Sequence, residues 1–179
     1  MGETLARLGP DLVFGLLGTT RSRGRRAPAQ AGRIDNYATV DYGLTALLLR
    51  AAVDSGVRPR FVYLSSAGVR SGSSNGYLAV RWRMEQEIEA SGLPYVIARP
   101  SFITGADRDE FRLGERVAAG FTDAALAVAG LLGAARLRDR YRSTTNAILA
   151  RALVRLALAP GRVNEVVESE GLREPLGGA

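Results

Sequence analysis

The amino-acid sequence predicts an α/β fold built on a parallel β-sheet. Two observations support this prediction: short apolar runs alternate along the chain with longer stretches of helical periodicity, and glycine, proline or aspartate bounds several of these segments. Such alternation is typical of a doubly wound sheet, in which helices connect neighbouring parallel strands. The 179 residues are enough for one domain with a buried core. We therefore treat 1–179 as a single domain whose ends, 1–10 and 171–179, are expected to fray.

Four segments are predicted to be strands. Residues 12–17 (LVFGLL) contain no polar side chain, which fits a parallel strand that is buried on both faces. The other strands are predicted at 61–64, 95–98 and 163–167. All four are expected to lie in one sheet.

Three segments have the spacing of amphipathic helices. Within 36–54, apolar residues recur at three- and four-residue intervals, and Gly56 closes the helix. The other two helices are predicted at 77–91 and 148–156. Residues 117–135 are rich in alanine and glycine and carry a central carboxylate, so they favour a packed helix over a membrane span.

The composition excludes several classes of enzyme. The chain has 24 arginines but no lysine, no histidine and no cysteine. Without these side chains there is no Ser-His-Asp relay, no thiolate nucleophile, no Schiff base, no phosphate-loop lysine, no disulfide and no zinc site of the usual kind. Aspartate, glutamate and tyrosine remain for proton chemistry. An all-oxygen metal site stays open, although the acidic residues show no calcium-loop spacing.

The net charge of +6 raises the question of an anionic partner. The arginines are spread along the chain, and the densest group, at 21–26, lies in a stretch with glycine, serine and proline that favours an exposed loop. Aromatic residues seldom alternate with these arginines, so we expect no nucleic-acid partner. We also expect no membrane partner. No secretory signal is recognisable at 1–10, and the expected location is the cytoplasm.

Candidate functional residues follow the predicted strands, because open parallel sheets bind ligands at the carboxyl ends of their strands. Gly18 follows the first strand and Ser66 follows the second. Tyr77 and Arg81 are four residues apart on the next helix, so their side chains can converge near Ser66. A phenol serves as an acid or base near neutral pH only when a neighbouring cation stabilises its phenolate. The alternative interpretation is that Tyr77 faces the core and Arg81 faces solvent.

These motifs resemble the short-chain dehydrogenase/reductase superfamily. The resemblance rests on a strand that ends in Ser65-Ser66, a helix that opens on Tyr-x-x-x-basic at 77–81, and a strand that ends in Arg99-Pro100. Within the superfamily the chain resembles the atypical branch typified by the Tat-interacting oxidoreductase. Three motifs carry this resemblance: LGTTR at 17–21, Val-Asp at 40–41 and RxExRxGE at 108–115. The resemblance covers about residues 11–168.

The resemblance implies a Rossmann-like NAD(P)-binding fold. It implies an oxidoreductase that uses NADP or NAD, with Tyr77 as the acid/base, Ser66 at the substrate carbonyl and Arg81 at the nicotinamide ribose. The implied substrate is a small carbonyl or alcohol. Residues 106–142 would form the helical segment on the substrate side, and the implied assembly is a homodimer. The implied catalytic residues are Ser66, Tyr77 and Arg81, and the implied cofactor-binding residues are Leu17, Gly18, Tyr77, Arg81, Ile103 and Arg112.

Two departures from the superfamily affect this interpretation. Arginine stands at 81 where the superfamily has lysine, and arginine does not give up a proton. Before Leu12 there is no strand with a glycine-rich turn and a helix that cradles a pyrophosphate. The chain is therefore expected to be the C-terminal part of the doubly wound fold, lacking the first β-α-β-α-β half, with an exposed edge at 12–17 that could pair with another chain.

Two functions remain after these departures. The first is an oxidoreductase of the short-chain dehydrogenase type or its truncated remnant. The alternative is a non-catalytic nucleotide-sensing or protein-interaction module on the same fold.

Overall fold

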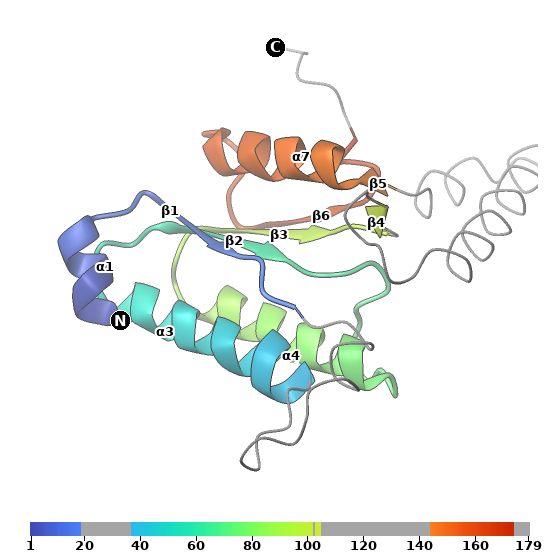
Figure 1. Cartoon of the computed structure of the whole chain (residues 1–179), viewed down its shortest axis with the longest axis horizontal. Helices are drawn as coiled ribbons and strands as arrows, with labels where there is room; N and C mark the ends of the chain where they lie inside the picture. Colours follow the sequence, from blue (N-terminus) through green and yellow to red (C-terminus); the bar gives the residue numbers. More distant parts are fainter. Residues whose placement is uncertain (19–36, 102, 105–143, 174–179) are drawn as a thin grey trace, which may run out of the picture.

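The computed structural model describes residues 1–18, 37–101, 103–104 and 144–173. Their centre is a four-stranded parallel sheet with the strand order β1-β2-β3-β6 (Figure 1). Its strands are β1 (Leu12–Gly15), β2 (Arg60–Leu64), β3 (Tyr95–Arg99) and β6 (Glu165–Glu168). The α/β class and the parallel sheet agree with the alternation of segments in the sequence.

Helices lie on both faces of this sheet (Figure 1). One face is covered by the π-helical segment η1 (Tyr37–Leu44), α3 (Thr45–Asp54) and α4 (Gly76–Ala90), and the other by α7 (Asn146–Leu158). Helix α1 (Gly2–Leu8) precedes β1 and packs against α3. A separate parallel ladder pairs β4 (Ile103–Thr104) with β5 (Thr144–Thr145). Among the described helices, none is long and apolar enough to span a membrane.

Side chains of the central strands alternate between two buried clusters. In β2, Phe61 and Tyr63 join the cluster beneath α3 and α4, while Val62 joins the cluster beneath α7. Because both faces are covered, β2 and β3 are largely apolar, as parallel strands usually are. The first cluster also contains Val13, Ala46, Leu49, Ala52, Met84, Ile88, Leu93 and Ile97; the second also contains Val96, Ala98, Leu149, Ala152, Leu153, Leu156, Ala157, Val167 and Leu172.

Within the described residues, the predicted strands and helices match the observed ones except near their ends. The strand predicted at 12–17 stops at Gly15. The helix predicted at 36–54 begins as the π-helical η1 and continues as α3. Helix α7 starts earlier than predicted because Thr145 caps it, its side chain accepting a hydrogen bond from the backbone N–H of Ile148 at 3.3 Å.

The N-terminal residues, which the sequence leads us to expect as frayed, include helix α1. This helix ends at Gly9, whose φ of 56° is left-handed and whose N–H donates a hydrogen bond to the Leu5 carbonyl at 2.9 Å. Leu5 also packs against the cluster beneath α3 and α4. Residues 106–142 and 174–179 lie outside the described part of the chain, so the predictions made for them stay predictions.

The start of the sheet corrects one expectation. β1, the helices η1 and α3, and β2 form a β-α-β unit near the N-terminus, with Leu12–Gly15 paired in parallel with residues 60–63. The expectation that the chain lacks the first β-α-β-α-β half of the fold is wrong. It rested on the absence of a glycine-rich turn before Leu12, whereas Gly15 and Gly18 lie within and just after β1.

Candidate functional site

Gly18, just beyond β1, lies against an ion pair formed by two helical segments. A Cβ atom placed on Gly18 would be 3.1 Å from Arg81 Nη2 and 3.3 Å from Asp41 Oδ1. Both distances are short for a Cβ contact, so glycine fits here and a larger residue would shift the pair. Gly18 is exposed, and its bare backbone lets another molecule approach the end of β1 closely.

Tyr77 stands at the start of α4, the helix that follows β2. Asn75 caps this helix: its Oδ1 accepts hydrogen bonds from the backbone N–H groups of Tyr77 at 3.0 Å and Leu78 at 3.3 Å. The Tyr77 ring is half-buried, with its centroid 4.8 Å from Arg81 Cζ and 5.2 Å from the Tyr37 centroid in an edge-to-face arrangement. The structure thus brings Tyr77 and Arg81 together.

Arg81 is buried, with 5% of its surface exposed, and does not face solvent as the alternative interpretation requires. Its Nη2 lies 2.9 Å from Asp41 Oδ1. Its Nη1 donates hydrogen bonds to the Leu64 carbonyl and, at 3.3 Å, to the Tyr63 hydroxyl. The guanidinium is therefore held from η1 on one side and from β2 on the other.

The surroundings of Arg81 keep it charged. Burial by itself lowers the pKa of this guanidinium, but the nearby Tyr63, Tyr77 and Asp41 side chains outweigh that effect and raise the pKa above its ordinary value. Arg81 Nε is buried and has no hydrogen-bond partner among the described residues. A fixed positive charge therefore lies beside the Tyr77 phenol.

Sequence reasoning assigned no role to Asp41 and Tyr63, the two residues whose side chains hold Arg81. Asp41 entered only as part of a family-like Val-Asp pair, although it shares a buried helix face with Thr45, four residues later. A carboxylate on a buried face is the signal that could have identified it. Tyr63 sits within an apolar strand, where nothing in the sequence separates it from a core residue; burial raises its pKa to about 12, so its hydroxyl stays protonated.

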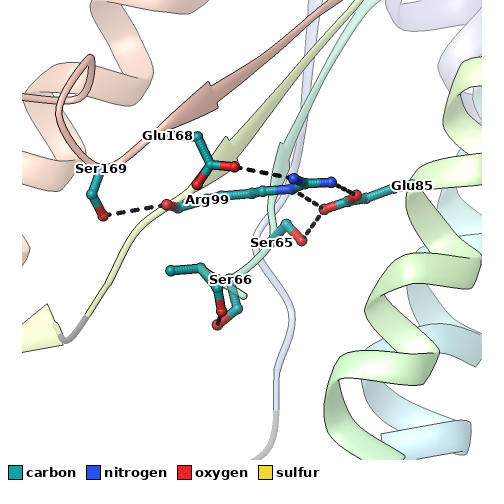
Figure 2. A network of polar contacts seen from close by, with 7 residues as sticks. Ser65, Ser66, Glu85, Arg99, Glu168 and Ser169 are labelled. Atoms are coloured by element: carbon teal, nitrogen blue, oxygen red, sulfur yellow. Dashed lines mark hydrogen bonds and ion pairs between the residues drawn. The ribbon is translucent and has the colours of Figure 1, made fainter. Parts of the chain in front are cut away.

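The two serines after β2 have different surroundings (Figure 2). Ser65 is buried and donates a hydrogen bond to Glu85 Oε1. Ser66 is half-buried, and among the described residues its hydroxyl makes only a 3.4 Å contact with the carbonyl of Ala67. Ser65 is therefore part of the structural network, whereas the Ser66 hydroxyl is the better placed to meet a ligand.

Arg99, at the end of β3, connects neighbouring elements at this edge of the sheet (Figure 2). Its Nε lies 3.1 Å from Glu85 Oε1 and its Nη2 lies 2.6 Å from Glu85 Oε2. Its Nη1 donates to Glu168 Oε1 at 3.1 Å, and its carbonyl accepts a hydrogen bond from Ser169 at 3.4 Å. Hydrogen bonds to Glu85 raise the pKa of Arg99. This network ties α4 to β3 and β6, and through Ser65 to β2.

The remaining residues assigned to the cofactor are not brought to Tyr77 in the same way. Leu17 directly precedes Gly18 and is 43% exposed, so it lies at the site's edge. Ile103 belongs to β4 and packs against the cluster beneath α7, on the other side of the sheet from α4. Arg112 lies outside the described residues.

Two observations bear on whether this edge fits a dinucleotide cofactor. Gly18 is exposed beyond β1, where its backbone lies against the Arg81–Asp41 ion pair, and buried Arg81 has an Nε without a partner among the described residues. Both features are compatible with a ligand at the end of β1, as expected at the carboxyl edge of a parallel sheet. Within the same described ranges, no group of three or more acidic residues could hold a metal ion.

A comparison with protein families decides the classification. A model described as NAD(P)H-binding matches residues 5–129. The chain belongs to this NAD(P)H-binding family. The match begins at residue 5, which also contradicts the expectation that the N-terminal half of the fold is missing. The predicted resemblance is confirmed at this level, as an NAD(P)H-binding protein similar to atypical short-chain dehydrogenases.

Curated relatives share the name fmp52. The protein fmp52, mitochondrial, of Aspergillus niger is 33% identical over 148 residues, which cover 81% of this chain and 56% of the relative. The protein fmp52-1, mitochondrial, of Aspergillus terreus is 32% identical over 152 residues, which cover 83% of this chain and 58% of the relative. The chain thus spans little more than half the length of these two relatives.

Solved structures support the fold. Triphenylmethane reductase of Citrobacter sp., complexed with NADP(H), aligns with a TM-score of 0.52 at 18% identity, covering 93% of this chain and 49% of the reductase. UDP-glucose 4-epimerase of Thermotoga maritima, with UDP-glucose, aligns with a TM-score of 0.51 at 22% identity, covering 92% of this chain and 58% of the epimerase. Both alignments agree with a Rossmann-like fold.

The relatives also correct the expected location. The fmp52 relatives are named as mitochondrial proteins, which contradicts the prediction of a cytoplasmic protein. That prediction rested only on the lack of a recognisable secretory signal at 1–10, and such reasoning does not distinguish compartments that proteins reach by other routes.

Proposed function

We propose that this chain is the NAD(P)-binding part of an oxidoreductase of the short-chain dehydrogenase type, acting on a small carbonyl or alcohol with NADP or NAD. The observation that carries the proposal is the position of the Tyr77 ring, whose centroid lies 4.8 Å from Cζ of the charged Arg81 guanidinium, while Nη2 of the same guanidinium lies against Gly18 beyond β1. A phenol beside a fixed cation can exchange a proton with a substrate oxygen, because the cation stabilises the phenolate.

Each residue has a proposed task. Gly18 and Leu17 receive the dinucleotide beyond β1, where both residues are exposed. The bound cofactor supplies the hydride chemistry. Ser66 holds the substrate oxygen by a hydrogen bond, and the Tyr77 hydroxyl donates a proton to that oxygen or accepts one from it.

The geometry changes the role that the resemblance implies for Arg81. Both of its Nη atoms are engaged, by Asp41 on one side and by Leu64 and Tyr63 on the other. We therefore assign Arg81 the electrostatic stabilisation of the phenolate and give it no part in ribose binding or in proton relay. An arginine suits this task because it keeps its charge and fixes its plane through several donors.

The proposal is tested by a titration of the protein with NADPH and NADH, followed by measurement of carbonyl reduction for the wild type and for Tyr77→Phe. We expect the variant to bind the cofactor as the wild type does and to lose about 10²- to 10⁴-fold in turnover. The matched control is Tyr95→Phe, which removes a hydroxyl at the first residue of β3, the end of the strand away from the candidate site. Equal turnover in wild type and Tyr77→Phe would falsify the catalytic assignment.

A second candidate function is a nucleotide-sensing or protein-interaction module without turnover. The observation that favours it is the arginine at position 81, buried and paired with Asp41, because arginine does not give up a proton and a lysine-like proton relay is lost. The same titration separates the two functions: cofactor binding without reduction of any tested carbonyl supports the module.

A further inference from the structure

We propose that Asp41 is a positioning residue of this site: it holds the Arg81 guanidinium against the Tyr77 ring, and in doing so sets the orientation and the charge around the phenol. The proposal rests on the proposed function, in which Tyr77 exchanges the proton. No role for Asp41 follows from the motif in which the sequence places it.

The first argument is the burial of the pair. The side chain of Asp41 is 0% exposed and that of Arg81 is 6% exposed, and 2.9 Å separates Oδ1 from Nη2. Burial of two charges is costly, and a buried ion pair contributes little net stability compared with apolar side chains of the same volume. A pair in this position therefore suggests a task other than stability, namely fixing one arrangement of η1 against α4.

The second argument is the way the guanidinium is fixed. Nη2 is bound by Asp41 of η1, whereas Nη1 is bound by the Leu64 carbonyl and the Tyr63 hydroxyl of β2. With acceptors on both sides, the guanidinium cannot turn without breaking a hydrogen bond. In this orientation its Cζ lies 4.8 Å from the Tyr77 centroid and 5.7 Å from the Tyr63 centroid. Asp41 supplies the only one of these contacts that carries a charge.

The third argument is the contact with Gly18. A Cβ atom placed there would lie only 3.1 Å from Arg81 Nη2 and 3.3 Å from Asp41 Oδ1, so the ion pair borders Gly18 directly. The ion pair therefore forms the floor beneath the end of β1. A ligand that approaches Gly18 from outside would lie above the same charges that hold Tyr77. Asp41 thus connects the cofactor side of the site with the proton-transfer side.

The charge balance gives the proposal a measurable consequence. Among the described residues, Arg81 of α4 and Tyr37 of η1 lie against the Tyr77 ring, and Asp41 of η1 and Tyr63 of β2 contact Arg81. Removal of the Asp41 charge leaves Arg81 without its counter-charge, which favours the phenolate. The pH profile of turnover should then move to lower pH, which a purely structural role for Asp41 would not produce.

The experiment compares Asp41→Asn with wild type, with Glu89→Gln as the matched control. Glu89 is exposed on α4, where its Oε2 accepts a hydrogen bond from Gln86 Nε2 at 3.0 Å. For Asp41→Asn we expect kcat to fall about tenfold or more, the cofactor Kd to change less than about threefold, and the pH profile to move to lower pH. Asp41→Glu, which keeps the charge, should keep the wild-type pH profile and also serves if Asp41→Asn does not fold.

A second measurement does not depend on turnover. Side-chain ¹⁵N spectra should show slowly rotating Nη groups on Arg81 in the wild type and in Glu89→Gln. In Asp41→Asn they should show faster rotation of these groups and shifted Tyr77 ring signals. Arg81→Lys and Tyr77→Phe assign these signals. Unchanged Arg81 and Tyr77 signals in Asp41→Asn overturn the positioning role, as does an unchanged kcat and pH profile. A wild type that binds neither NADPH nor NADH overturns the proposed function instead, and the spectra still decide whether Asp41 positions Arg81.

Discussion

Arg99 of β3 binds the carboxylate of Glu85 of α4 with two nitrogen atoms, at 3.1 Å and 2.6 Å. Glu85 is completely buried, so its charge is balanced by protein groups and not by water. Ser65 donates a further hydrogen bond to the same carboxylate. The orientation of α4, and with it the position of Tyr77, therefore depends on a pair of charges outside the catalytic groups.

Glu85→Ala is expected to lower the free energy of unfolding by about 3–5 kcal/mol, because it leaves the Arg99 charge and the Ser65 hydroxyl without their buried partner. Urea denaturation measures the effect. The control is Glu165→Ala, which breaks the more exposed pair with Arg162 at 2.7 Å and should cost about 0–1 kcal/mol. Similar losses in the two variants would contradict the role of Glu85.

Arg81→Lys restores the residue type of the superfamily and would raise activity if arginine were a defect. The structure leads to a different expectation, because one ammonium group cannot reach Asp41 on one side and Leu64 and Tyr63 on the other as the guanidinium does. We expect a loss of about 1–3 kcal/mol in stability and no gain in turnover. Thermal unfolding and a turnover assay test this, with the exposed Arg83→Lys as control.

Stability should fall at high pH because of Tyr63. Burial raises the pKa of this phenol from 10.0 to about 12 in the folded chain. Below pH 10 the phenol is protonated in both the folded and the unfolded chain, so its contribution to the free energy of unfolding is fully present. Between pH 10 and 12 only the unfolded chain loses the proton, so the free energy of unfolding declines by up to about 3 kcal/mol. Urea denaturation of wild type and Tyr63→Phe between about pH 9 and about pH 11 measures it. A stability difference that does not change with pH would refute the prediction.

The cap of α4 should be worth about 1 kcal/mol. Asn75→Ala removes the acceptor for the N–H groups of Tyr77 and Leu78, and loss of an N-cap side chain typically costs about 0.5–2 kcal/mol. Asn75→Asp keeps the acceptor and adds a favourable charge at the helix N-terminus, so it should be neutral or slightly stabilising. Thermal unfolding of the two variants measures the difference, and equal midpoints would show that the cap does not contribute.

Local patterns allowed much of the fold to be predicted. The apolar run at 61–64 and the helical spacing at 77–91 are properties of neighbouring residues, and the strands and helices formed from them have nearly the predicted bounds. The same reasoning placed Tyr77 next to Arg81, because residues four apart on a helix share a face. Gly18 could be predicted at the same edge because it follows a strand.

Contacts between distant segments could not be predicted in this way. Asp41 and Arg81 are 40 residues apart in the chain and meet only once η1 packs against α4. Sequence reasoning therefore treated Arg81 as available to a cofactor, although its Nη atoms are engaged. It also misjudged the N-terminal part of the fold, because it searched for a glycine-rich turn before Leu12 and none precedes that residue.

In the described sheet β1 occupies an edge and pairs only with β2. Local opening of an edge strand requires much less free energy than global unfolding, so its backbone amides exchange with solvent hydrogen faster than those of a central strand. Because Gly18 lies directly beyond β1, a ligand seated there would have to suppress this fraying. Deuterium uptake at 12–18 should therefore slow on cofactor binding even if no atom of the core moves.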